Sequence, residues 1–217
     1  MNELQSAYDY FNKELFGGEL PACLITLQRK GHRVMGYFSP QRFGSNKSKK
    51  QTDEIAMNPQ YFKGRDHTEI LQTLVHEMCH LWQQHFGMPS RRSYHNKEWA
   101  AKMIEIGLMP SSTGKEGGKT TGQHMGDYPI GGGPFVVATK ALFKSGFAIT
   151  WYDRAGDIKK PPSLITAPEG QEEAGEGGEV KTPSGTRRKF TCPSCDATAY
   201  GKGSLKLICG ECMKPMG

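Results

Sequence analysis

The chain has 217 residues, enough for one medium-sized domain and a small appendage. Only 36% of its residues are hydrophobic, and it contains 27 Gly and 13 Pro, so we expect a sizeable part to be loop or linker. No apolar run could span a membrane, and the first residues lack the pattern of a secretion signal, so we expect a cytoplasmic protein. A reducing compartment favours metal ligands or buried thiols over disulfides for the 6 Cys.

The net charge of +6 is unevenly distributed along the chain. Residues 168–180 hold five Glu and no Lys or Arg, whereas seven basic residues and two acidic ones follow from Lys181 onward. Two basic blocks around an acidic stretch favour an anionic partner, of which nucleic acid is the leading candidate. An ordinary solvated surface is the alternative explanation of this pattern.

The N-terminal third predicts one helix and three strands. Apolar residues at helical spacing predict an amphipathic helix over Glu3–Phe16. The β-rich segments Cys23–Gln28 and Val34–Ser39 flank a short turn, so we expect them to form a hairpin. The Lys- and Ser-rich stretch Arg42–Thr52 predicts a loop, and Glu54–Met57 predicts a third strand.

An HExxH motif, residues 76–80, lies within an apolar run of helical period from His67 to Phe86. Residues i and i+4 share one face of a helix, so His76 and His80 can reach the same metal ion. Glu77 would then stand beside the ion, where it can take a proton from water as a general base. The alternative for such histidines is a structural role in the core.

A catalytic zinc usually takes three protein ligands, so a third residue is needed. His85 lies five residues beyond His80, about 140° around the helix, and points away from the ligand face. His95 follows a polar loop and opens a second helical pattern that ends at Gly107. We therefore expect His95 to complete the site.

The motif and its surroundings resemble the SprT-like (Spartan-type) zinc metalloproteases. After the HExxH motif come fourteen residues and then His95-Asn96-Lys97-Glu98-Trp99, which resembles the stretch that carries the family's third histidine. Residues 11–21 and 53–59 resemble the family's N-terminal signature and the strand before its active-site helix. The resemblance covers roughly residues 1–109, with a further match at the C-terminal cysteines.

This resemblance implies an α+β, zincin-like fold, with a small sheet beside the HExxH helix. It also implies that the strand Glu54–Met57 runs along the active-site cleft and can hold an extended peptide by edge pairing. The implied activity is that of a gluzincin- or metzincin-like zinc endopeptidase, with His76, His80 and His95 as ligands. Its implied substrates are DNA-bound or DNA-crosslinked proteins.

The segment that follows predicts a long loop over Ser111–Gly126, a helix around Phe135–Leu142 and a strand over Phe147–Tyr152. His124 and Tyr128, near the beginning of this addition, are candidates to donate a hydrogen bond to an oxyanion. A packing or loop role is the alternative for both.

Two CxxC pairs near the C-terminus predict a second metal site. Cys192 with Cys195 and Cys209 with Cys212 have the spacing of one tetrahedral structural zinc. So short a segment cannot bury enough core to fold alone, so the metal would supply the folding energy. Free or redox-active thiols are the alternative.

Cations and aromatic rings lie close together in the same segment, a composition that suits phosphates and stacked bases. The candidate nucleic-acid-binding residues are Arg187, Arg188, Lys189, Phe190, Tyr200, Lys202 and Lys206. A zinc ribbon can equally serve as a protein-docking module.

The sequence thus predicts three parts: a SprT-like zincin metalloprotease domain (1–165), a Gly/Glu/Pro-rich linker (166–186) and a four-cysteine zinc ribbon (187–217). We expect two Zn²⁺ ions, one catalytic and one structural. The expected function is cleavage of DNA-bound or DNA-crosslinked proteins, as in DNA repair, by a monomer that binds DNA non-specifically and no membrane. The alternative is a DNA-binding or regulatory zinc protein whose zincin core is not an effective protease.

Overall fold

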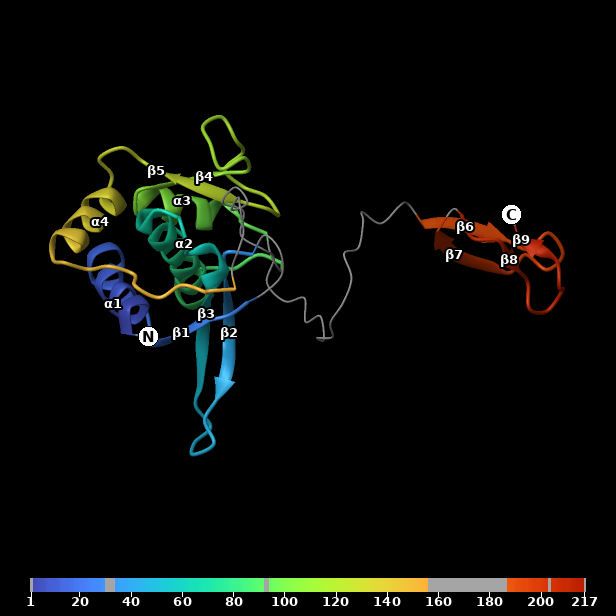
Figure 1. The fold of residues 1–217 in the computed structure, drawn as a ribbon, viewed down its shortest axis with the longest axis horizontal. Coiled ribbons are helices and arrows are strands. Elements are labelled where there is room, and N and C mark those ends of the chain that lie inside the picture. The colour runs from blue at the N-terminus through green and yellow to red at the C-terminus, as the bar shows by residue number, and fades with distance from the viewer. Residues whose placement is uncertain (1, 30–33, 92–93, 156–186, 203, 217) are drawn as a thin grey trace. The chain divides into compact units, whose positions relative to one another are not determined.

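The computed structural model describes residues 2–29, 34–91, 94–155, 187–202 and 204–216 (Figure 1). The chain divides into two compact units, Met1–Glu172 and Glu173–Gly217, which are described separately. The described residues form four α-helices and several small sheets, so the fold is mixed α/β. The predicted linker 166–186 lies outside the described residues. None of the described helices combines the length and the apolar composition needed to cross a membrane.

Helix α2 (His67–Phe86) forms the centre of the first unit and has the predicted bounds. The Asp66 carboxylate caps its first turn by accepting a hydrogen bond from Thr68 N at 2.7 Å. Apolar residues on several sides of the helix are fully buried: Leu71, Leu74, Val75, Met78 and Leu81. This wide burial follows from its neighbours, because α2 packs against α1, α3 and the three-stranded sheet.

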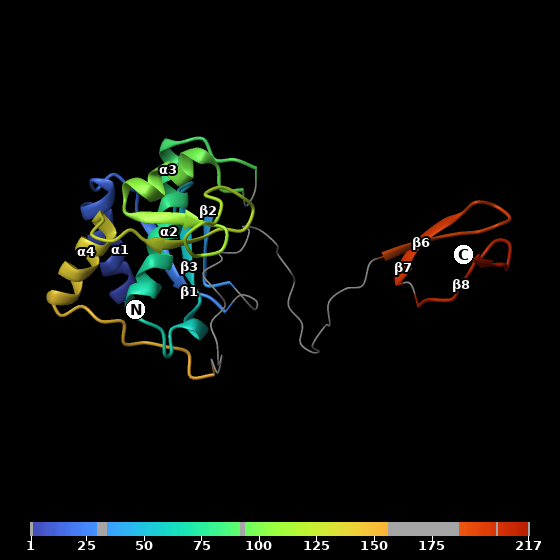
Figure 2. The same cartoon turned by 90° about the horizontal axis from the view of Figure 1, so that it is seen from above.

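Helix α1 (Asn2–Phe16) and helix α4 (Pro134–Lys144) lie side by side, although more than a hundred residues separate them in the chain (Figure 2). The rings of Phe11 and Phe135 stack with centroids 5.9 Å apart. Tyr10 also donates a hydrogen bond to the main-chain oxygen of Ala138 at 3.0 Å. The sequence predictions of both helices are confirmed.

Three strands form the main sheet: β1 (Cys23–Leu27), β2 (Gly36–Gly44) and β3 (Gln51–Met57). Their order is β1-β3-β2, with β3 parallel to β1 and antiparallel to β2. The predicted hairpin between the first two strands is therefore wrong, because β3 lies between them. From Asp53 onward β3 is buried, and such a strand needs a partner on both edges to satisfy its backbone groups.

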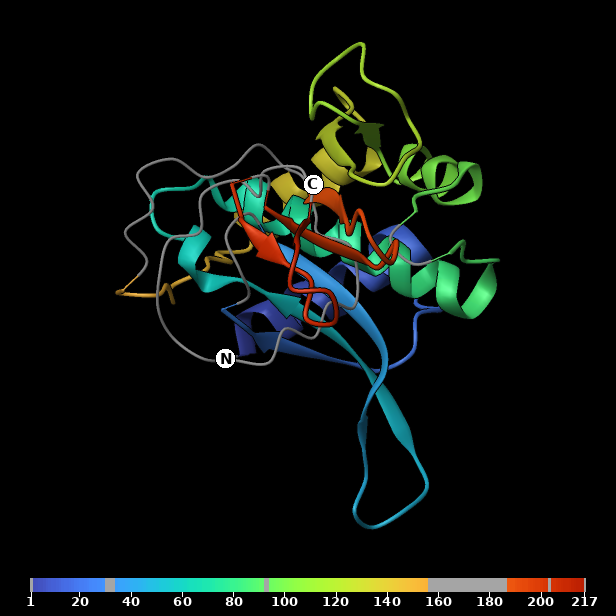
Figure 3. The same ribbon diagram turned by 90° about the vertical axis from the view of Figure 1, so that its right-hand side faces the viewer.

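The same strand order corrects the prediction for the cleft. A strand paired on both sides has no free edge, so Glu54–Met57 cannot hold a peptide by edge pairing. Among the described strands of this sheet, β2 is the edge strand that lies against α2. The loop predicted over Arg42–Thr52 is in part the extension of β2 and β3 into a hairpin that leaves the body of the unit (Figure 3).

Helix α3 (Lys97–Glu105) is capped by Asn96, whose side-chain oxygen accepts a hydrogen bond from Trp99 N at 3.0 Å. Strand β4 (Leu108–Ser111) then pairs antiparallel with β5 (Gly126–Pro129), a small sheet that the sequence pattern did not predict. The predicted long loop connects these two strands. A short 3₁₀ turn, η1 (Pro59–Tyr61), follows β3.

The strand predicted over Phe147–Tyr152 is wrong, because this segment has no strand partner among the described residues. It instead crosses the surface as an extended segment. Ile149 is buried, whereas Trp151 is 65% exposed. Its apolar composition therefore reflects contact with the core at one position rather than membership of a sheet.

The second unit contains two small antiparallel pairs. Strand β6 (Arg187–Thr191) pairs with β7 (Thr198–Lys202), and β8 (Leu207–Ile208) pairs with β9 (Pro215–Met216). Its described hydrophobic core consists of three buried side chains: Phe190, Cys192 and Cys209. So small an apolar core favours a fold that depends on a metal.

We predict that Gly107→Ala destabilises the first unit by about 1–3 kcal/mol. Gly107 follows α3 with a φ of +91°, and an added Cβ would lie 2.9 Å from the backbone nitrogens of Pro134 and Phe135. Gly131→Ala is the matched control, because nothing lies within 4 Å of a Cβ there. Urea unfolding followed by tryptophan fluorescence measures the effect, since all 3 Trp belong to the first unit. Equal stability of the two variants would contradict the prediction.

Candidate metal centres

Three predicted histidines converge in the first unit. Helix α2 places His76 and His80 one turn apart, and His95 lies just before α3. A pair of backbone hydrogen bonds with Gly122 holds His95 in place: His95 N to Gly122 O at 2.9 Å and Gly122 N to His95 O at 3.1 Å. One potential ligand atom from each of the three rings lies within 4.8 Å of the others, and the Nε2 atoms of His80 and His95 are 3.1 Å apart.

Second partners orient two of these rings. His76 Nδ1 lies 2.7 Å from Asp127 Oδ2, and His95 Nδ1 lies 3.1 Å from Gly122 O. A carboxylate or carbonyl oxygen can only accept, so Nδ1 carries the proton in both rings. Each ring then presents Nε2 as its ligand atom, which is the arrangement that metal-binding histidines use.

Asp127 is a functional residue that the sequence analysis missed. It comes from β5, it is buried, and its Oδ1 also accepts a hydrogen bond from Gln72 Nε2 at 2.7 Å. Gln72 precedes His76 by one helical turn, so both face the same carboxylate. Gln72 stands four residues before His76, and this spacing could have indicated a partner that both side chains share. Nothing in the sequence, however, links Asp127 to a histidine 51 positions away.

The environment keeps two of the rings neutral. Burial, together with the neighbouring imidazoles, lowers the pKa of His95 to about 3 and the pKa of His80 well below its ordinary value. Burial also acts to lower the pKa of His76, but the hydrogen bond and charge of Asp127 outweigh it and raise that pKa. A neutral imidazole is the form that binds a metal, so this cluster suits a cation.

Trp99 forms an apolar wall of the site. Its ring is fully buried and lies 4.4 Å, centroid to centroid, from His95. It stacks on His80 with centroids 5.3 Å apart and meets His76 edge-on at 4.9 Å. Contact with one rigid ring restricts the rotamers of all three histidines.

Glu77 is buried beside the histidines, with one oxygen unengaged. The backbone N–H of Phe38 on β2 faces its carboxylate. Its Oε1 is buried and has no hydrogen-bond partner among the described residues. Burial raises the pKa of Glu77 to about 7, although the Phe38 N–H acts to lower it. A carboxylate with this pKa can both accept and release a proton near neutral pH.

Gly36 allows β2 to approach α2 at this point. A Cβ at Gly36 would lie 3.0 Å from Thr73 Cγ2 and 3.4 Å from Glu77 Cγ. The absence of a side chain therefore lets the strand lie directly against the helix that carries Glu77.

The two predicted oxyanion donors are not among the clustered ligand residues. Tyr128 follows Asp127 on β5, and neighbouring residues of a strand point to opposite faces. His124 is exposed, although it is close enough to His95 for its charge to lower that pKa. The proposed role of both residues stays a prediction.

The second unit brings its four cysteines together: Cys192, Cys195, Cys209 and Cys212. Their sulfur atoms lie within 4.8 Å of one another, and no disulfide joins them. The Sγ atoms of Cys195 and Cys209 are 3.6 Å apart, far beyond a disulfide bond of about 2.05 Å. Four thiols at such distances suit one tetrahedral metal ion.

The two CxxC segments have the same backbone turn. Cys192 N donates to Ala197 O at 2.9 Å, and Cys209 N donates to Lys214 O at 2.8 Å, five residues ahead in both cases. The fourth residue after each first cysteine, Asp196 or Met213, has a left-handed φ of 55° or 52°. The fold thus presents each cysteine pair through one repeated local structure.

The candidate nucleic-acid residues of this unit divide between two faces of the β6–β7 pair. Tyr200 is 67% exposed and lies directly opposite the exposed Lys189. Lys202 and Lys206 are also exposed, whereas the side chains of Arg187 and Arg188 lie outside the described residues. Phe190 is only 3% exposed, so it is a core residue, contrary to the prediction that it meets nucleic acid. Strand alternation turns it to the face opposite Tyr200 and Lys189.

A family model decides where the first unit belongs, because the SprT-like model matches residues 4–117. The chain belongs to the SprT-like family. The match, which is to a metalloprotease-related family, includes the three histidines and Glu77, whereas Asp127 and the four clustered cysteines of the second unit lie beyond it. A stretch of 54 residues is also 56% identical to a Salmonella typhimurium protein described as "Uncharacterized protein in mucB 3'region". That stretch covers 25% of this chain and 72% of the Salmonella protein.

We predict that Asp127→Asn weakens metal binding at this SprT-like histidine cluster by about 10–100-fold. The amide keeps the shape of the side chain but removes the charge that His76 Nδ1 faces at 2.7 Å. Cobalt(II) titration measures the affinity, because thiolate and imidazole sites give distinct spectra. Tyr128→Phe, at the position next to Asp127 on β5, is the matched control. It should bind cobalt(II) with the affinity of the unchanged protein. Unaltered cobalt affinity in Asp127→Asn would show that the carboxylate does not support the ligand.

Proposed function

We propose that this SprT-like protein is a zinc-dependent endopeptidase whose centre is formed by His76, His80 and His95. The observation that carries the proposal is the convergence of three imidazoles, two buried and that of His80 partly buried, beside the Glu77 carboxylate, whose Oε1 is unengaged. Ligand nitrogens about 2.0–2.1 Å from a tetrahedral zinc lie about 3.4 Å apart, and the observed 3.1 Å between two Nε2 atoms fits this geometry. Three protein ligands also leave one position for a reactant.

Glu77 would carry the protons of the reaction. Zinc held by the three histidines would supply Lewis acidity, which polarises a peptide carbonyl and makes water a stronger acid. In our proposal Glu77 Oε1 takes a proton from the attacking water while the oxygen of that water bonds to the carbonyl carbon. The same oxygen then gives the proton to the amine nitrogen as the C–N bond breaks. The nearby Phe38 amide would help to hold the carboxylate in position for both transfers.

The substrate would lie along β2. This strand is an edge of the described sheet, and Gly36 and Phe38 both lie against Glu77. An extended peptide can add to such an edge through main-chain hydrogen bonds, which demand little of its sequence. Binding of this kind supports a protease with broad specificity.

We further propose that the substrates are proteins bound or crosslinked to DNA. Support comes from the resemblance to the Spartan-type members of the family and from the exposed Lys189, Tyr200 and Lys202 of the second unit. A second zinc held by the four cysteines would stabilise this unit, because its described core is so small. Binding of the second unit to DNA would raise the local concentration of the protease near its targets.

We predict that Glu77→Gln abolishes peptide cleavage, with a rate loss of about 10²–10⁴, and keeps the zinc of the histidine cluster. The amide cannot take a proton, and Glu77 is not among the three clustered ligands. Cleavage of a DNA-binding protein and elemental analysis of the same preparation measure the two effects. Glu105→Gln, an exposed position on α3, is the matched control. Full activity in Glu77→Gln would show that the proposed metalloprotease mechanism is wrong for this chain.

We predict that Tyr200→Ala weakens binding of single-stranded DNA by about 1–3 kcal/mol, the usual loss for one stacked base. Tyr200→Phe should retain the affinity, because it keeps the ring. Met213→Ala is the matched control, since Met213 is a 75% exposed apolar side chain of the same unit. Fluorescence anisotropy of a labelled strand at fixed salt measures the binding. If Tyr200→Ala binds as tightly as the control, the second unit is better explained as a protein-docking module.

A further inference from the structure

The outer part of the β2–β3 hairpin, residues 40–52, forms a basic arm. It carries Arg42, Lys47, Lys49 and Lys50 and contains no Asp or Glu. All four cations are exposed, and the three lysines form no ion pair with any residue that the structure describes. Figure 3 shows the arm extending away from the helices of the first unit.

The base of the basic arm is fixed to the body of the unit. Between Ser39 and Phe43 the register with β3 shifts by a bulge, where Gln41 has a φ of 50°. Gln41 N donates to Asp53 Oδ1 at 2.7 Å, and the other oxygen of this buried carboxylate lies 2.6 Å from Nε2 of His85 on α2. Bulges redirect strands, so these contacts set the angle at which the arm leaves the sheet.

The tip of the basic arm is also ordered. Ser45 N donates to Lys50 O at 2.9 Å and closes the loop. Two serine hydroxyls accept backbone hydrogen bonds within it, from Lys47 N at 3.1 Å and from Lys50 N at 3.3 Å. The three lysines therefore project from a turn of defined shape.

We propose that the basic arm binds duplex DNA by entering its major groove. The major groove is about 12 Å wide and about 8.5 Å deep, and it admits a two-stranded β-ribbon. Beyond the bulge the arm has two strand pairs, Phe43 with Thr52 and Gly44 with Gln51, which rise about 7 Å, and the closed loop from Ser45 to Lys50 extends it further into the groove. The lysines would meet phosphates on both sides, and the absence of carboxylates removes repulsion.

This contact would fix the distance between DNA and the histidine cluster. Phe38, whose amide faces Glu77, and Arg42 lie on the same strand, at most about 13 Å apart because the bulge lies between them. A protein bound to the duplex beside the arm would therefore lie within reach of the β2 edge. This consequence rests on the proposed peptidase function, whereas DNA binding by the arm does not.

The test uses the full chain with Lys47, Lys49 and Lys50 all changed to Ala, in the Glu77→Gln background. We expect about tenfold weaker binding of a short labelled duplex at moderate salt. The slope of log affinity against log salt should become shallower by up to about 2.7, since each phosphate contact contributes about 0.9. The same three positions changed to Arg should retain most of the affinity.

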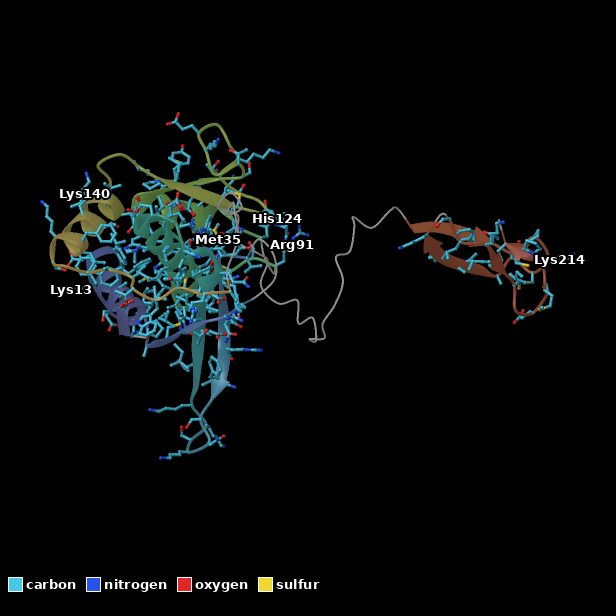
Figure 4. All side chains as sticks on the ribbon, viewed as in Figure 1. Lys13, Met35, Arg91, His124, Lys140 and Lys214 are labelled. Carbon is cyan, nitrogen blue, oxygen red and sulfur yellow. The ribbon has the colours of Figure 1, made fainter. Side chains whose placement is uncertain are left out.

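The matched control removes the same charge elsewhere, with Lys13, Lys140 and Lys144 changed to Ala on α1 and α4 (Figure 4). Equal losses of affinity in arm and control variants would overturn the proposal, because net charge alone would then explain them. A loss on single-stranded DNA as large as that on the duplex would also overturn it, since the groove would play no part.

Cleavage assays separate this proposal from the proposed function. With Glu77 intact, the arm variant should cleave a free peptide normally and a duplex-bound protein more slowly. If the unchanged protein cleaves nothing, the peptidase proposal fails, while the duplex-binding result still decides the role of the arm.

Discussion

The buried carboxylate of Asp127 is the contact on which the geometry of the first unit most depends. It joins β5 to α2 through Gln72 and His76, so one side chain links a small sheet, the central helix and the histidine cluster. An uncompensated charge in this position would be costly, and two hydrogen bonds offset that cost. Because both partners stand on one helical face, they also fix the rotation of α2 relative to β5.

A second constraint acts on the neighbouring face of the helix, about 100° around its axis. Gly36 brings β2 against α2, and the amide of Phe38 meets Glu77 there. One strand thereby positions the carboxylate, offers an edge for an extended peptide and continues into the basic arm. The proposed substrate edge and the proposed DNA contact thus lie on one strand, which also contacts the proposed base on α2.

The two metal centres meet different physical needs. The histidine cluster lies within an extensive core, so the first unit has apolar stabilisation of its own. The second unit buries few apolar side chains, and its four cysteines stand on two copies of one turn. A metal at the first centre would serve chemistry, whereas a metal at the second would supply the folding energy that so short a segment lacks.

The sequence by itself determined the features that depend on neighbouring residues. Helical period predicted α1, α2 and α4, and i,i+4 spacing placed His76 and His80 on one face. The spacing of the cysteines likewise indicated that they would come together. Only the tertiary structure decided the insertion of β3 between β1 and β2, the partnership of Asp127 with His76 and the burial of Phe190. Each of these depends on which distant segments pair, and a local pattern carries no information about the partner of a strand edge or of a lone carboxylate.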